Sequence, residues 1–200
     1  MSLFRKIFGT SNDASNEEIH SQYNDLSQDK SATVEERFTN FFMKNGGKFI
    51  YCENTNEVKE QLLNILEEND WFESEVMCNE ELLFPMLDEN NLTYIKPLEP
   101  KFLFASCESL IAEEGSVLFS SNQIRQHKPN ELPKNIVIFA KTSQIMETKS
   151  DGLREIKKKY LTAYPTNITT IKYFEEVKEE DFLHYGSSAK NLYLLLLEDQ

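Results

Sequence analysis

The chain has 200 residues, of which 40% are hydrophobic and 28% are charged, and this composition predicts one globular domain with a full core. Its formal net charge of −13 argues against a nucleic-acid-binding protein, because neutralising phosphates requires a positive surface. No apolar run reaches membrane-spanning length and the N-terminus lacks the long apolar region of a secretory signal, so we expect a cytoplasmic protein without a membrane anchor.

The first 30 residues predict an N-terminal arm, because Thr10–Lys30 is polar and has few large apolar side chains. Residues 31–200 are expected to form the α/β domain. Ser31 or Thr33 is a suitable cap for its first helix, and Gly46-Gly47 ends that helix. The next predicted elements are a strand at Lys48–Cys52, a helix from Asn54 or Thr55, a strand at Glu75–Cys78, a helix at Glu80–Leu87 that Pro85 disturbs, and a strand at Leu92–Ile95.

This alternation of helices and strands predicts crossover connections and a mostly parallel sheet. Phe102–Ala105 and Ser109–Phe119 then place three apolar runs close together, so we expect an antiparallel or mixed part there. Ile136–Ala140 is apolar on both faces, which is typical of a central strand. The remaining predicted elements are a polar loop at Ser120–Lys134, a helix at Leu153–Leu161, a strand at Asn167–Tyr173, an acidic connection at Phe174–Phe182 and a strand at Leu192–Leu197.

The segment Ser109–Phe119 also carries the first candidate site residue. It places Glu113 and Glu114 at the turn between two apolar runs. Because carboxylates are costly to bury and ligands of α/β proteins gather at strand ends, Glu113 is a candidate catalytic base or hydrogen-bond acceptor. Adjacent side chains on a strand point to opposite faces, so the two glutamates are not expected to act as a pair. The alternative is a solvated hairpin turn.

Polar residues on and after this hairpin are candidates for binding a small anion. The turn offers backbone N–H groups, and the cationic side chains of the following loop suit a carboxylate or a phosphate. The predicted ligand-binding set is Gly115, Ser116, Ser120, Ser121, Asn122, Arg125, His127 and Lys128. The alternative for each of these residues is a solvated polar position.

The cysteines and histidines give no metal motif. Cys52, Cys78 and Cys107 are odd in number and lack CxxC spacing, which is typical of buried reduced thiols. The three histidines are equally scattered. We therefore expect no metal site, and no cofactor is evident from the sequence.

Several motifs follow the order of a known family. The stretch Ala112–Ser116 (AEEGS) is similar to an Ala-Glu-Thr-Gly-Thr turn, and Leu132–Lys134 (LPK) before an apolar strand is similar to Leu-Pro-Pro. His184–Ser188 (HYGSS) keeps part of a Gly-Val-His-Gly-Pro turn, whereas Thr169–Glu175 replaces a Ser-Gly-Pro-Ser loop. From Lys48 to the C-terminus the chain thus resembles the LUD domain of the lactate utilization protein C (LutC/YkgG) family.

This resemblance implies a three-layer fold of the NagB/RpiA/CoA transferase-like group, with a mostly parallel sheet flanked by helices. It implies a LutC-like role in lactate utilization, as an accessory or ligand-binding component beside the iron–sulfur proteins of a lactate oxidation complex. It also implies that Glu113, which matches the glutamate of the family's turn, belongs to the site.

Two alternatives to this role stay open. One is a stand-alone enzyme or binding module for a small anion that is CoA-, folate- or sugar-phosphate-like, which rests on analogy of fold. The other is a degenerate interaction module, which the missing Ser-Gly-Pro-Ser loop favours.

Overall fold

The computed structural model of the chain describes residues 32–174 and 190–199. The N-terminal arm, the alternative cap Ser31, most of the acidic connection after Phe174 and the turn around His184 lie outside the described residues. The predictions made for these segments therefore remain predictions.

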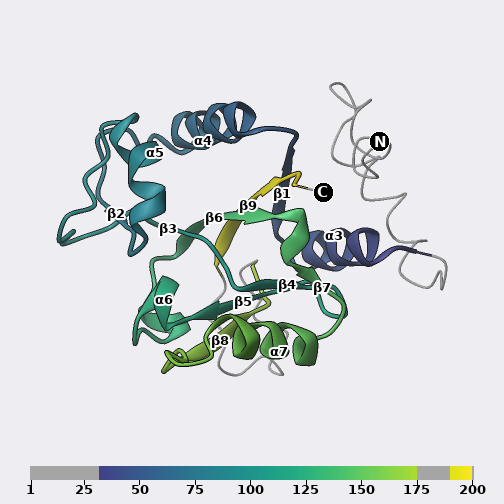
Figure 1. Cartoon of the computed structure of the whole chain (residues 1–200). Helices are drawn as coiled ribbons and strands as arrows, with labels where there is room; N and C mark the ends of the chain where they lie inside the picture. Colours follow the sequence, from purple (N-terminus) through teal and green to yellow (C-terminus); the bar gives the residue numbers. More distant parts are fainter. Residues whose placement is uncertain (1–31, 175–189, 200) are drawn as a thin grey trace, which may run out of the picture.

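Five parallel strands form the central sheet, and the C-terminal strand lies inside it (Figure 1). Their order is β1 (Lys48–Cys52), β9 (Asn191–Leu197), β6 (Asn135–Lys141), β3 (Phe102–Ala105) and β2 (Val76–Met77). Strands β6 and β9 pair from Asn135 opposite Asn191 to Lys141 opposite Leu197. Ile136 and Val137 are both fully buried although they face opposite sides, which confirms β6 as a central strand.

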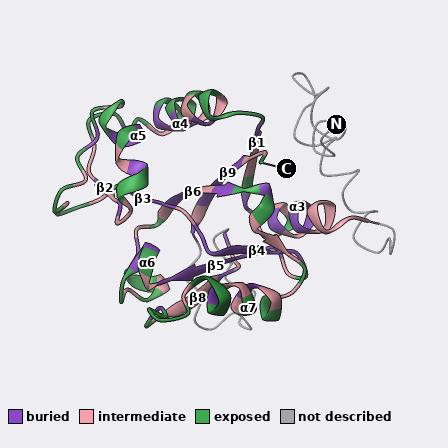
Figure 2. Cartoon of the chain, in the orientation of Figure 1, coloured by how far each residue is buried: buried purple, intermediate pink, exposed green. Residues whose placement is uncertain are grey.

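Helices cover one face of this sheet. Helices α4 (Thr55–Asn69) and α5 (Phe84–Asp88) lie over it, and their apolar side chains pack against Phe102 and Phe104 of β3. The alternate β3 residues, Leu103 and Ala105, belong to the core on the opposite face. Figure 2 shows the central strands largely buried between these layers. The chain is thus an α/β protein with a parallel sheet flanked by helices.

A second, smaller sheet and helix α3 (Val34–Lys44) cover the other face. The strand order of the small sheet is β7 (Ile145–Met146), β4 (Ser109–Ile111), β5 (Ser116–Ser120) and β8 (Ile168–Ile171). Strand β5 is antiparallel to β4 and β8, whereas β4 and β7 are parallel. The predicted mixed part is confirmed for Ser109–Phe119, whereas Phe102–Ala105 is strand β3 of the parallel central sheet.

Helix α7 (Lys149–Lys159) packs on the outer face of the small sheet. Its Ile156 joins Ile111 of β4 and Leu118 of β5 in a separate apolar cluster. The helix begins four residues before the predicted start at Leu153, because Thr148 and Asp151 form a capping box. The same device starts α3, where Thr33 is the cap.

Three other segments differ from their predictions. Glu80–Leu87 divides into a 3-10 turn (Glu81–Leu83) and helix α5, and Pro85 lies in the first turn of α5, where its missing N–H is not needed. Leu92–Ile95 contributes only one bridge, from Thr93 to Glu75, instead of a full strand. The predicted polar loop after β5 contains the short helix α6 (Ser121–Ile124).

Candidate functional site

The predicted site residues lie at both ends of the β4–β5 hairpin. Glu113 and Gly115 are at its turn, whereas Ser120 is the last residue of β5 and caps α6. Strand β5 therefore separates the turn residues from the group around Ser120 and Arg125. The structure does not bring these two groups together.

The turn holds neighbouring helices in place. Glu113 is exposed, and its Oε1 accepts a hydrogen bond of 2.8 Å from the backbone N–H of Lys149 at the start of α7. Ser116 is buried and donates to Glu114 at 2.7 Å, and Gly115 packs directly on the backbone of α3. These contacts show that the turn has a structural role. The catalytic role of Glu113 stays a prediction.

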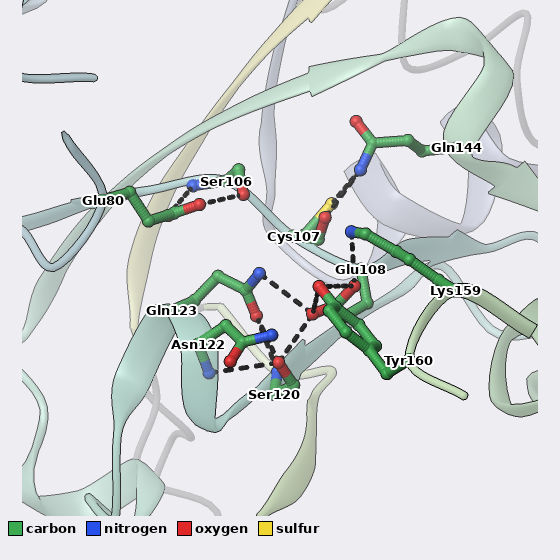
Figure 3. A network of polar contacts seen from close by, with 10 residues as sticks. All are labelled: Glu80, Ser106, Cys107, Glu108, Ser120, Asn122, Gln123, Gln144, Lys159 and Tyr160. Carbon is green, nitrogen blue, oxygen red and sulfur yellow. Dashed lines mark hydrogen bonds and ion pairs between the residues drawn. The ribbon is translucent and has the colours of Figure 1, made fainter. Parts of the chain in front are cut away.

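Beyond the other end of the hairpin, polar side chains gather where parallel strands end (Figure 3). Glu80 follows β2, Ser106 and Glu108 follow β3, and Gln144 follows β6. Because parallel strands end at the same edge of their sheet, these residues meet at the edge where α/β proteins usually bind ligands. We call this set the carboxyl-end network.

Glu108 is the centre of the carboxyl-end network, with a side chain that is only 1% exposed. Its carboxylate accepts hydrogen bonds from Ser120 Oγ at 2.6 Å and Tyr160 OH at 3.0 Å. Gln123 Nε2 donates at 3.1 Å and Lys159 Nζ at 3.0 Å. Burial alone raises the pKa of Glu108, but these donors outweigh it and hold the pKa below its ordinary value. Glu108 is therefore ionised and fully satisfied.

Glu80 has the opposite environment. Its carboxylate accepts from Ser106 N at 2.7 Å and from Ser106 Oγ at 2.5 Å. Burial nevertheless raises the pKa of Glu80 above its ordinary value, and the charge of Glu108 adds to the increase. Cys107, next to Glu108 in the sequence, is a free buried thiol, and burial raises its pKa, which disfavours the reactive thiolate form.

A cavity of about 520 Å³ lies beside the edge strand β2. Three segments line it: the end of β2, the loop from Tyr94 to Pro100, and the chain after α6. The lining residues are Met77, Cys78, Asn79, Tyr94, Lys96, Pro97, Pro100, Arg125, His127, Glu131, Leu132 and Pro133. Arg125 and His127 of the predicted ligand-binding set thus line one cavity, whereas Lys128 is not part of the lining.

The cationic groups of this cavity are available to a ligand. Within residues 32–174 and 190–199, the side chains of Lys96 and Arg125 have no hydrogen bond or ion pair. His127 Nδ1 lies 2.9 Å from the carbonyl of Ile124, and because a carbonyl only accepts, Nδ1 carries the proton and Nε2 remains free. Glu131 is the one carboxylate among the lining residues, and its Oε2 already accepts from the N–H of Lys128 at 2.9 Å.

Hydrogen bonds between side chains and the backbone fix the two segments that carry these cations. Glu75 Oε2 accepts from the N–H groups of Leu98 at 2.7 Å and Glu99 at 2.6 Å, which holds the loop around Lys96. Asn167 Nδ2 donates to the carbonyls of Arg125 and His127, at 3.4 Å each.

The cavity and the carboxyl-end network are joined by one side chain. Asn79 lines the cavity, and its Nδ2 donates to the carbonyl of Gln123 at 2.8 Å. Gln123 in turn donates to Glu108. Ser121 and Asn122 lie next to Gln123 in the chain, and their hydrogen bonds involve the backbone. Ser121 Oγ accepts from the N–H of Thr166, and the N–H of Asn122 donates to Ser120 Oγ.

The described part of the chain contains neither three clustered His, Cys, Asp or Glu residues that could hold a metal ion nor a helix long and apolar enough to cross a membrane.

Comparison with known proteins places this architecture in a family. The chain is similar in fold to a DUF162 family protein from Deinococcus radiodurans, with a TM-score of 0.59 and 11% identity over 83% of this chain and 96% of that chain. No curated protein matches the chain. The model of the LUD domain matches residues 35–196, which include every described strand up to the penultimate residue of β9. The chain therefore belongs to the LUD domain family.

Proposed function

We propose that this LUD-domain protein is a cytoplasmic accessory component of lactate or other 2-hydroxy-acid utilization that binds an anionic ligand in the cavity beside β2. The observation that carries the ligand site is the pair Lys96 and Arg125, which line one cavity and have no carboxylate partner among residues 32–174 and 190–199, although the whole chain has a net charge of −13. Unpaired cations at a concave surface bind carboxylates and phosphates through charge-assisted hydrogen bonds. Membership of the LUD family supports the process in which the protein acts.

Anion binding is tested by thermal unfolding of the full chain with increasing inorganic phosphate or lactate, at constant ionic strength. A bound anion stabilises the native state in proportion to its saturation. We expect saturable stabilisation by at least one of the two anions, and its loss in Arg125→Ala and Lys96→Ala. Lys128→Ala is the matched control, because Lys128 is an exposed cation of the same segment outside the cavity. Equal stabilisation of all four proteins would contradict the site.

The place in lactate utilization is tested by affinity capture from anaerobically prepared lysate of the source cells. Recovery of cysteine-rich iron–sulfur proteins, absent from a capture with unrelated bait, supports an assembly role. Recovery of the chain alone, with anion binding intact, contradicts that role and leaves the stand-alone binding module.

A second candidate function is acid–base catalysis. The observation that favours it is the pair Glu80 and Glu108, whose environments move their pKa values in opposite directions at the carboxyl edge of the sheet. Incubating the protein with any stabilising organic anion, followed by mass spectrometry of that anion, tests this function. Product formation that Glu80→Gln abolishes supports an enzyme, and an unchanged anion supports binding without turnover.

A further inference from the structure

The residues that line the cavity beside β2 fall into two chemical groups. Lys96 and Arg125 are cationic, and His127 adds a polar ring. The other lining residues are mainly apolar. We call six of them the apolar wall: Met77, Tyr94, Pro97, Pro100, Leu132 and Pro133. A ligand that matches both groups of residues has an anionic group and an apolar body.

The size of the cavity excludes a three-carbon acid as a close fit. Its volume of about 520 Å³ lies within the roughly 300–1,000 Å³ of pockets that enclose drug-sized ligands. Lactate at Arg125 would leave most of the apolar wall in contact with water. The volume therefore indicates a ligand several times larger than lactate.

Tyr94, an aromatic residue of this apolar lining, is held in place by its neighbours. The ring of Tyr94 stacks on Phe84, with centroids 4.4 Å apart and planes at 28°, and its hydroxyl donates to Asp88 at 2.9 Å. Tyr94 is thus fixed at both its ring and its hydroxyl. Prolines add stiffness to the same wall because their φ angles are fixed. Rigid, flat apolar surfaces favour planar rings as ligands.

Asn79 and His127 add two hydrogen-bond acceptors to the lining of the cavity. Asn79 uses its Nδ2 to donate to Gln123, so its Oδ1 remains available. His127 uses its Nδ1 on Ile124, so its Nε2 remains available as an acceptor in the neutral ring. These acceptors match N–H donors on a ligand.

Backbone geometry independently marks the two cations. Lys96 and Arg125 both have a φ of 52°, a left-handed conformation that is unfavourable for residues other than glycine. Only three other non-glycine residues in the described chain, Asp70, Glu73 and Asn91, have positive φ. Such conformations cluster at ligand clamps, where function maintains them against their energetic cost.

We infer that the ligand of this cavity is an organic anion with a planar heterocycle: a phosphate or carboxylate for Lys96 and Arg125, and ring N–H donors for Asn79 and His127. This inference rests on the proposed function, because it names the ligand class of the same cavity.

Isothermal titration of the full chain with four probes tests the inference. Adenosine 5′-monophosphate carries both a ring with N–H donors and a phosphate, ribose 5-phosphate has only the phosphate, adenosine has only the ring, and lactate is a small carboxylate. We expect adenosine 5′-monophosphate to bind at least about tenfold more tightly than each of the other three. Arg125→Ala should weaken adenosine 5′-monophosphate about tenfold without changing adenosine.

Variants of the apolar wall separate ring recognition from phosphate binding. Tyr94→Leu should weaken adenosine 5′-monophosphate and leave ribose 5-phosphate unchanged, whereas Tyr94→Phe, which keeps the ring, should bind both normally. Lactate or ribose 5-phosphate binding as tightly as adenosine 5′-monophosphate, and depending on Arg125, would overturn the ring inference and leave the proposed function intact. No binding of any probe, together with no stabilisation by phosphate, would overturn both.

Discussion

At the scale of single residues, the carboxyl-end network contains two glutamates whose pKa values are shifted in opposite directions by their surroundings. Glu108 has four donors around a fully buried carboxylate, so its negative charge is stabilised in the folded protein. Within the described residues, Glu80 has the two donors of Ser106, and burial dominates its pKa. The folded state therefore favours the charged form of Glu108 and the neutral form of Glu80.

Replacing Glu108 tests the first half of this argument. The pKa of Glu108 is lower in the folded chain than its ordinary value of 4.5. Ionised Glu108 therefore stabilises the folded state at pH values above 4.5, and this stabilisation is lost as the pH falls below 4.5. We expect Glu108→Gln to lower the free energy of unfolding by about 1–3 kcal/mol at pH 7, because buried donors lose a charged acceptor. The difference from wild type should shrink as the pH falls toward 3, measured by urea unfolding.

Replacing Glu80 should give the opposite pH dependence. The pKa of Glu80 is higher in the folded chain than its ordinary value of 4.5. Protonated Glu80 therefore stabilises the folded state at pH values below 4.5, and this stabilisation is lost as the pH rises through the folded-state pKa. Glu80→Gln should therefore gain stability relative to wild type as the pH rises from 4 to 7. Glu113→Gln is the control for both variants, because Glu113 is exposed. Parallel pH profiles for the Glu80 and Glu108 variants would contradict the assignment.

Arg125 allows a test of whether backbone strain is kept for binding. Its φ of 52° and ψ of −129° suit glycine, so Arg125→Gly relieves about 1–3 kcal/mol of strain at an entropic cost of about 0.5–1 kcal/mol. We expect this variant to unfold at higher urea than wild type and to lose phosphate stabilisation. Lys128→Gly is the control: its φ of −80° is relaxed, so this variant should lose stability and keep binding. A destabilised Arg125→Gly would show that the conformation is not strained.

At the scale of elements, the β4–β5 turn fits closely against helix α3. Gly115 has a φ of 63°, and a Cβ there would lie 2.3 Å from the backbone of both Phe41 and Phe42. Neither backbone atom can move without displacing the helix. We expect Gly115→Ala to cost about 3 kcal/mol or more, from left-handed strain and overpacking together, as measured by urea unfolding.

Gly152 of α7 is the matched control for this close approach. A Cβ there would lie 3.0 Å from Ile111 Cδ1, 3.1 Å from Leu118 Cδ2 and 3.3 Å from Ser109 Cβ, which are longer side-chain contacts than the backbone approach at Gly115. Alanine also gains about 1 kcal/mol of helix propensity over glycine. Gly152→Ala should therefore remain within about 1 kcal/mol of wild type. Equal losses in both glycine variants would argue against the docking of the turn on α3.

The elements with long apolar runs or local caps could be predicted from the sequence. Strand β6 is apolar on both faces, and Thr33 caps α3 next to a clear helical pattern. The first turn of α7 was missed because it is polar, so only the Thr148 capping box indicates it. Helix α6 has four residues, too few for a periodic pattern.

The candidate site was only partly predictable, because long-range contacts assemble it. Arg125 and His127 could be chosen as cations of a polar loop, but no local pattern connects Lys96 with Arg125 across the chain. Glu108 follows the apolar strand β3, so the argument that placed Glu113 at a strand end also applies to Glu108 and could have predicted it as a site residue. What the sequence could not show is that Glu108 is buried and Glu113 is solvated.

At the scale of the whole molecule, two cores share the central sheet. Cys107 lies in the core between the two sheets, and Cys52 lies in the core under α4 and α5. Strands β6 and β9 contribute alternate side chains to both cores, so neither core can open without breaking the same strands. We therefore expect the two cores to unfold as one cooperative unit, whereas the two-residue edge strand β2 can open locally.

Thiol modification measures this cooperativity directly. All three cysteines are free and buried, and burial raises the pKa of Cys52 to about 12 and that of Cys78 to about 11, so modification requires opening of the structure. We expect iodoacetamide at pH 8 to modify Cys78, beside β2, at least about tenfold faster than the other two. Cys52 and Cys107 should react at a common rate that rises equally with urea, as measured by mass spectrometry of the labelled peptides.

The comparison between Cys52 and Cys107 decides the argument, because each reports one face of the sheet. A faster reaction at either of them, with a weaker urea dependence, would show that its core opens without the other. Cys78 provides an internal control, since it lines the cavity: a bound anion should slow its modification by stabilising the segment after β2. If ligand slowed Cys52 and Cys107 but left Cys78 unchanged, the local opening of β2 would leave the binding site intact, and the anion would not bind the segment after β2.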